Sequence, residues 1–183
     1  MYEDEEIISD VPEFVGSVAE LIEDEVSGDF YQEVLVNGQP LDPSHIRCGD
    51  IDSFTRGLVR PVLGYLGYDD VGSEDYGFRS RMSNGKKIAF VVIPMNHELS
   101  SSPVDVRDLL LNECLDFVAV TDGLRWVYAY RHGEIVSLGD VVFDSSGLVR
   151  GLMGLEGGRE PDPKIGSLFV KVFGYDKHWH PAS

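Results

Sequence analysis

Two histidines near the end of the chain have the spacing of a metal chelate. His178 and His180 stand on either side of Trp179, with Asp176 close by. In an extended strand, residues two positions apart point to the same face, and imidazole is a good ligand for Zn²⁺. The alternative is a pair of solvated histidines in an exposed tail, which is the interpretation that we favour.

Three aromatic residues alternate along a predicted strand at 126–130. This alternation places Trp126, Tyr128 and Tyr130 on one strand face. Aromatic faces of this kind can stack on nucleic-acid bases. More often they pack in a core or against neighbouring strands, and we favour packing here.

Two arginines, Arg79 and Arg81, share the face of a predicted strand with Asp75. Guanidinium groups can bind phosphate or another anion. They can equally form salt bridges with nearby carboxylates. Because the chain contains 32 Asp and Glu residues, we favour salt bridges.

The hydrophobic pattern along the chain predicts an α/β fold. We expect helices at about 11–27, 50–66 and 103–116, with a short helix at 147–153 and with Pro61 kinking the second helix or shifting its start. We expect strands at 30–36, 75–82, 88–93, 117–121, 126–130 and 134–138, with a final strand at 167–173.

The connections between these elements predict how the strands pair. Asn84-Gly85 is a strong signal for a hairpin turn. One helix separates the strands at 88–93 and 117–121, so these two should be parallel. With 183 residues, we expect a single domain. It would consist of an N-terminal extension at 1–49, a core at 50–145 and a looser C-terminal extension at 146–183.

Residues 51–131 contain a series of short motifs in a recognisable order. The motifs are Leu66-Gly67-Tyr68 at the end of a helix, Asp75-Tyr76, Gly85-Lys86 in a hairpin, Thr121-Asp122-Gly123 in a turn, and a strand with Trp126 and Tyr128. In order and spacing they resemble the N-terminal nuclease domain of the type I restriction enzyme motor subunit, a branch of the PD-(D/E)XK nuclease superfamily. The resemblance implies a restriction-endonuclease-type fold, a mixed α/β structure whose central sheet of four or more strands is flanked by helices.

The sequence departs from this family at its catalytic residues. In the family, an Asp and a Glu hold a divalent metal and a Lys helps to orient or activate the attacking water. Where Glu-x-Lys should stand, this chain has Ile93-Pro94-Met95. Asp75 remains as a candidate ligand, with Glu74 beside it and Glu98 just past the strand. We expect no cofactor, or Mg²⁺ if the site has been rebuilt.

Three functions are open at this point. The first is a non-catalytic binding or assembly module in a restriction, repair or mobile-element context, whose partner is a protein or a second copy of the chain. The second is a divergent Mg²⁺-dependent nuclease that uses Asp75, Glu74 and Glu98. The third is an acidic decoy that mimics DNA and occupies a DNA-binding protein.

Several features predict a cytoplasmic protein. No run of 18 apolar residues occurs, so we expect no membrane span. The acidic start lacks the basic and apolar regions of a secretory signal. Cys48 and Cys114 form no CxxC pair, and we expect two ordinary thiols in a reducing compartment.

The net charge of −17 has three possible origins. It can reflect halophilic adaptation to a salty cytoplasm, DNA mimicry, or an ordinary acidic surface. The chain has only five Lys against ten Arg, and this scarcity of Lys favours the first origin. The charge also disfavours tight binding of nucleic acid at low salt.

Salt adaptation predicts a steep dependence of stability on KCl. The melting temperature, followed by circular dichroism, should rise as KCl increases from tenths of molar to several molar, because the added ions screen repulsion among carboxylates. A flat or falling curve would contradict salt adaptation.

Overall fold

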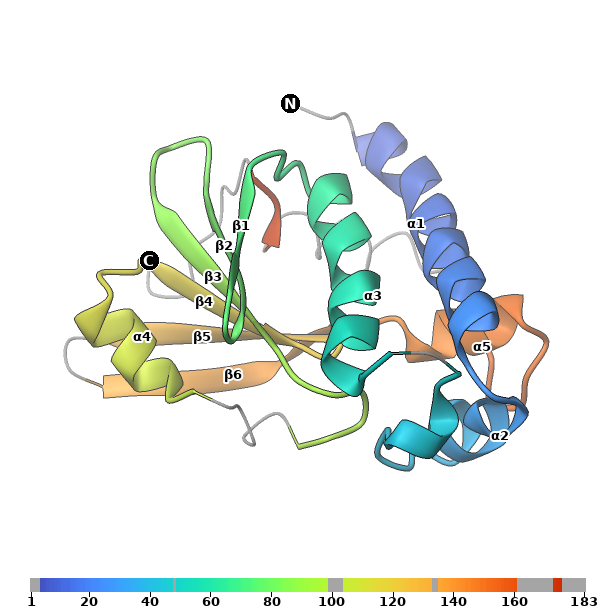
Figure 1. Cartoon of the computed structure of the whole chain (residues 1–183). Helices are drawn as coiled ribbons and strands as arrows, with labels where there is room; N and C mark the ends of the chain where they lie inside the picture. The colour runs from blue at the N-terminus through green and yellow to red at the C-terminus, as the bar shows by residue number, and fades with distance from the viewer. Residues whose placement is uncertain (1–3, 48, 99–103, 133–134, 161–172, 176–183) are drawn as a thin grey trace.

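A six-stranded sheet and the helices around it form the described part of the chain (Figure 1). The computed structural model describes residues 4–47, 49–98, 104–132, 135–160 and 173–175. The helical elements are α1 (Asp4–Glu25), α2 (Gly28–Phe30), a π-helix (Tyr31–Val36), a 3₁₀ turn (Pro43–His45), α3 (Ile51–Tyr65), α4 (Val106–Asn112) and α5 (Ser146–Leu152). The strands are β1 (Val71–Glu74), β2 (Gly77–Arg81), β3 (Lys87–Val92), β4 (Phe117–Thr121), β5 (Arg125–His132) and β6 (Ile135–Asp144).

The strands lie in the sheet in the same order as in the sequence, from β1 to β6. β3 and β4 are parallel, with α4 in the crossover between them, and every other neighbouring pair is antiparallel. Two predictions are thereby confirmed, namely the mixed α/β architecture with at least four strands and the parallel pairing of these two strands. The predicted hairpin at Asn84-Gly85 joins β2 to β3.

Both faces of the central strand β3 are buried. Ile88, Phe90 and Val92 belong to a core cluster with residues of α1 and α3. Ala89 and Val91 belong to a second cluster with residues of α4. In Figure 1, α1 and α3 lie side by side on one side of the sheet. The continuous apolar run of this strand therefore reflects burial on two faces, as expected for a central parallel strand.

The segment predicted as a strand at 30–36 is helical, so that prediction is wrong. It forms the end of α2 and a π-helix, and Phe30, Val34 and Leu35 are buried in the main core cluster. This spacing of four and five residues places the apolar side chains on one helical face. Packing of that face overrides the strand preference of the valines and aromatics. α1 also begins earlier than predicted, at Asp4.

The predicted helix at 50–66 is α3. The Asp50 carboxylate caps its start by accepting from the backbone N–H of Ser53 at 2.8 Å. The bonds to Ser53 hold the pKa of the Asp50 carboxyl below its usual value. Pro61 lies inside the helix without shifting its start. Pro61 is exposed, as is Gly57, whose carbonyl has no N–H to accept from at the proline.

The predicted strand at 75–82 begins later than expected, at Gly77, and ends at Arg81. Asp75 and Tyr76 form the turn between β1 and β2. Gly77 follows with φ near +149°, and a Cβ there would lie 2.1 Å from the carbonyl oxygen of Phe90. Only glycine allows this close approach of two backbones.

The end of the chain is described in part. The predicted short helix at 147–153 is α5. The predicted final strand at 167–173 lies, apart from Phe173, outside the described residues. No helix among the described residues combines the length and the apolar character that crossing a membrane requires.

Three glycines should respond differently to alanine. Gly57 and Gly64 lie on the exposed side of α3 with nothing within 4 Å of an added Cβ. Gly57→Ala and Gly64→Ala should each stabilise the protein by about 0.5–1 kcal/mol, because alanine favours the helix. Gly77→Ala should cost about 3 kcal/mol through backbone strain and overlap. Chemical denaturation of the three variants measures these changes, and a stabilising Gly77→Ala would refute the turn geometry.

Candidate functional site

The carboxyl ends of β1, β3 and β4 meet at one edge of the sheet. β1 and β3 run in the same direction because each is antiparallel to β2, and β4 is parallel to β3. Glu74 ends β1, Ile93 follows β3 and Asp122 follows β4. This edge contains the residues at which the nuclease resemblance implies a metal site.

The two positions that should carry Glu and Lys are filled by core residues. Ile93 and Met95 are both 0% exposed. Ile93 belongs to the cluster beneath α4, whereas Met95 belongs to the main cluster on the other face. Neither side chain can bind a hard cation or move a proton, so these positions contribute packing and no chemistry.

The remaining acidic candidates are Glu74 and Asp75. Asp75 is exposed in the turn between β1 and β2, and Glu74 is half-buried. The Glu74 carboxylate lies 3.5 Å from Nε of Arg79, which also pairs with Glu113 and donates to the hydroxyl of Tyr76. Arg79 is therefore held in ion pairs with carboxylates, the alternative that we favoured over a phosphate contact.

The second arginine of the predicted pair, Arg81, is exposed at the end of β2. Its partner in the strand register is Lys87 of β3.

Arg56 on α3 binds the turn that carries Asp75. Its Nη1 donates to the carbonyls of Glu74 at 2.8 Å and Gly77 at 3.0 Å, and its Nη2 donates to the carbonyl of Asp75 at 2.8 Å. Its Nε binds the Asp52 carboxylate at 2.7 Å. The guanidinium of Arg56 is therefore surrounded by oxygen atoms at the turn. Its charge would repel a divalent cation placed beside it.

Sequence reasoning missed Arg56, although the sequence contained a signal for it. Asp52 and Arg56 are four residues apart on a predicted helix, the spacing of a helical ion pair. The spacing does not reveal the three carbonyls of the turn, because they belong to residues about twenty positions further along the chain.

The loop after β3 contains His97 and Glu98. The His97 ring lies with Nε2 2.9 Å from the carbonyl oxygen of Leu41, and Glu98 is exposed. Within the described ranges, no group of three His, Cys, Asp or Glu side chains could hold a metal ion. His178 and His180 lie outside the described residues.

Asp122 is a fully buried carboxylate whose oxygens are all engaged. Oδ1 accepts from the backbone N–H groups of Leu124 and Arg125 at 3.0 and 2.8 Å. Oδ2 accepts from the backbone N–H of Asn96 at 3.1 Å and lies 2.7 Å from Nη2 of Arg125. The same Nη2 donates to the carbonyl of His97 at 2.8 Å. This carboxylate therefore joins β4 and β5 to the loop after β3 and has no lone pair left for a metal.

The aromatic candidates on β5 lie in the core. Trp126 and Tyr128 are 0% and 2% exposed, and both rings pack against Phe173. Burial raises the pKa of the Tyr128 phenol far above its usual value. Neither ring can stack on a base or contact a partner in this state. The side chain of Tyr130 lies outside the described part.

The comparisons with known proteins add no relative. No family model, no curated protein and no solved structure was found to match this chain. In the geometry of the site, arginines bind carboxylate and carbonyl oxygen atoms at this end of the sheet.

Asp122→Asn should destabilise the protein by about 3 kcal/mol, because the substitution removes the charge that pairs with Arg125 inside the fold. Asp69→Asn, in the exposed loop after α3, is the control and should change stability by less than about 0.5 kcal/mol. Urea denaturation of both variants gives the difference. Equal stabilities would show that the buried pair contributes nothing.

Proposed function

We propose that this chain is a restriction-endonuclease-like module that has lost catalysis and acts by binding or assembling with a partner in a DNA-related context. The order of elements supports this proposal. After α3 and β1, the hairpin of β2 and β3 is followed by α4, β4 and β5. Apart from the additional strand β1, this is the order that the resemblance implies. The parallel pairing of β3 with β4 agrees with the same arrangement.

The burial of Ile93 and Met95 is the observation that carries the loss of catalysis. A catalytic pair at the end of this strand would need polar side chains that reach solvent and substrate. Here the two positions are 0% exposed and pack into opposite core clusters. Restoring Glu and Lys would bury two unpaired charges, so the present residues belong to the stability of the fold.

The contacts of Arg56 also support the loss of catalysis. Its guanidinium binds the carbonyls of Glu74, Asp75 and Gly77. A permanent cation of the protein thereby supplies the positive charge at this turn that a metal would otherwise bring. The turn is stabilised without a metal.

The proposed partner is a protein. The net charge of −17 repels a nucleic-acid backbone and attracts basic surfaces. Because Trp126 and Tyr128 are buried, the aromatic strand does not offer a contact to a second copy through these two rings. The partner must use another surface.

The alternative is a divergent Mg²⁺-dependent nuclease. It would use Glu74 and Asp75, with Glu98 from the loop after β3, and two of these carboxylates, Asp75 and Glu98, are exposed. This alternative requires that a divalent ion bind at the turn despite the charge of Arg56.

Tests with a divalent metal ion and with DNA distinguish the non-catalytic module from the nuclease. We expect no DNA cleavage in molar KCl with Mg²⁺ or Mn²⁺, and no rise in melting temperature at millimolar metal, because a ligand stabilises only a protein that binds it. The assay compares the wild type with Asp75→Ala, and Asp69→Ala serves as a matched surface control. Cleavage that is lost in Asp75→Ala and kept in Asp69→Ala would establish the nuclease instead.

A further inference from the structure

The chain contains two Asn-Gly dipeptides, Asn37-Gly38 and Asn84-Gly85, and all four residues are exposed. Asparagine before glycine is prone to a spontaneous rearrangement of the backbone, because glycine has no Cβ to shield its nitrogen from the preceding side chain. The reaction requires a backbone nitrogen that is free to attack and a peptide plane that is free to rotate. The surroundings of the two dipeptides differ in both respects.

The hairpin between β2 and β3 holds the second dipeptide in place. The N–H of Gly85 donates to the carbonyl of Met82 at 2.9 Å, so the attacking nitrogen is already engaged. The side-chain oxygen of Asn84 accepts from the backbone N–H of Lys86 at 3.0 Å, which fixes the orientation of the amide. The N–H of Met82 in turn donates to the carbonyl of Lys86 at 2.8 Å. These hydrogen bonds must open before Asn84 can react.

The first dipeptide follows the π-helix, and its attacking nitrogen is free. The N–H of Asn37 donates to the carbonyl of Gln32 at 3.0 Å, and the N–H of Gln39 donates to that of Glu33 at 2.9 Å. Between them, the N–H of Gly38 has no acceptor among the described residues. Gly38 has a φ of +71° and nothing within 4 Å of an added Cβ, so its peptide has room to rotate. One exposed bond restrains the Asn37 amide, from Nε2 of Gln32 at 3.1 Å.

The residues just after this dipeptide attach the N-terminal segment to the loop after β3. The carbonyl of Gln39 accepts from the side-chain amide of Asn96 at 3.1 Å. The N–H of Leu41 donates to the carbonyl of Met95 at 2.9 Å. An additional backbone atom at position 37 would shift these groups relative to their partners and weaken both bonds.

We propose that Asn37-Gly38 is a site of spontaneous deamidation, whose isoaspartate product loosens the attachment of residues 37–41 to the loop after β3. The nitrogen of Gly38 attacks Cγ of Asn37, and the amide nitrogen leaves as ammonia with the proton of the attacking N–H. One water then opens the five-membered imide. Opening at the backbone carbonyl gives isoaspartate, in which the main chain passes through Cβ and Cγ, and opening at Cγ gives aspartate. Both products carry one more negative charge than asparagine.

The test is peptide mapping by mass spectrometry after incubation of the full chain in mildly alkaline buffer, below its melting temperature. Electron-transfer fragmentation distinguishes isoaspartate from aspartate at each site. Asn37 should convert about tenfold faster than Asn84 or more, because the bonds of Gly85 and Asn84 must open first. In concentrated guanidinium chloride these bonds are lost, so the two rates should become similar. The unfolded chain is thereby the internal control for the effect of local sequence.

Matched variants separate the rearrangement from the change of charge. Gly38→Ala should slow the conversion of Asn37 and leave that of Asn84 unchanged, because its Cβ shields the attacking nitrogen. The isoaspartate form, purified by anion exchange, should lose hydrogen-exchange protection about tenfold at the amides of Gln39 and Leu41. Asn37→Asp has the same charge on an ordinary backbone and should keep this protection.

Three results would overturn the proposal. The first is conversion of Asn84 as fast as that of Asn37 in the folded chain, which would mean that the free N–H of Gly38 does not decide the reactivity. The second is the same ratio of the two rates in the folded and the unfolded chain. The third is equal protection of Gln39 and Leu41 in the isoaspartate form and in the unmodified protein. None of these results depends on metal, DNA or a partner, so failure here is distinct from failure of the proposed non-catalytic function.

Discussion

The carboxylate of Asp122 is the point at which the layers of this fold are joined. A buried charge is tolerated only when it is paired and fully hydrogen-bonded, and Asp122 meets this condition through Arg125 and through backbone N–H groups. One of these N–H groups belongs to Asn96, whose side-chain amide donates to the carbonyls of Val34 and Gln39. The pairing of one carboxylate thereby links the sheet edge to the segment that precedes α3.

The interactions at this end of the sheet hold neighbouring elements together. This explains why the end has few groups available for metal-dependent catalysis. In a metal nuclease, carboxylates at the ends of neighbouring strands must keep free oxygen atoms for a cation. Here Arg125 occupies the carboxylate after β4, Arg79 pairs with the carboxylate that ends β1, and Arg56 binds the carbonyls of the turn. In the proposed non-catalytic function, these internal cations take the electrostatic role of a metal, and Ile93 and Met95 are buried in the core.

The sequence predicts the sheet well where burial alone decides the structure. The strands 88–93 and 117–121 are continuously apolar because both of their faces are covered, and their pairing follows from the helix between them. The segment 30–36 was predicted wrongly because its residues favour strands in isolation and the packing of Phe30 and Val34 decides otherwise. The hydrogen bonds of Arg56 to the carbonyls of the turn between β1 and β2 could not be predicted. Sequence spacing carries no information about which loops meet in space.

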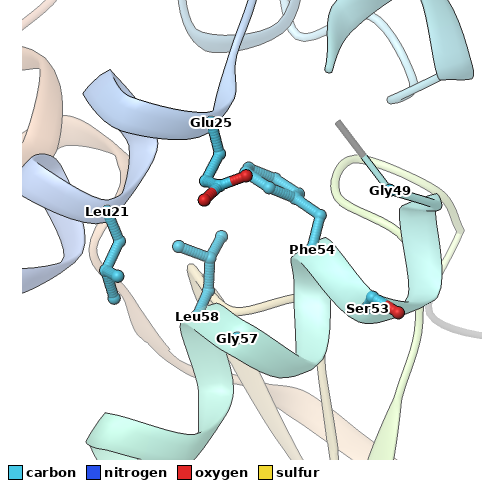
Figure 2. Close-up of a pocket in the computed structure, with 7 residues that line it drawn as sticks. All are labelled: Leu21, Glu25, Gly49, Ser53, Phe54, Gly57 and Leu58. Atoms are coloured by element: carbon cyan, nitrogen blue, oxygen red, sulfur yellow. The ribbon is translucent and has the colours of Figure 1, made fainter. Parts of the chain in front are cut away.

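The N-terminal segment decides where a binding surface can exist in this fold. Val18 and Ile22 of α1 share one core cluster with Leu58 and Phe90, so the segment is packed into the same core as the sheet. The packing of α1 covers one face of α3 and leaves a pocket between the two helices, lined by Leu21, Glu25 and Leu58 among others (Figure 2). A core consisting of residues 50–145 alone would expose α3 and would have no such pocket. The packing of α1 and the hydrogen bonds of Asn96 to Val34 and Gln39 both join residues 1–49 to the core.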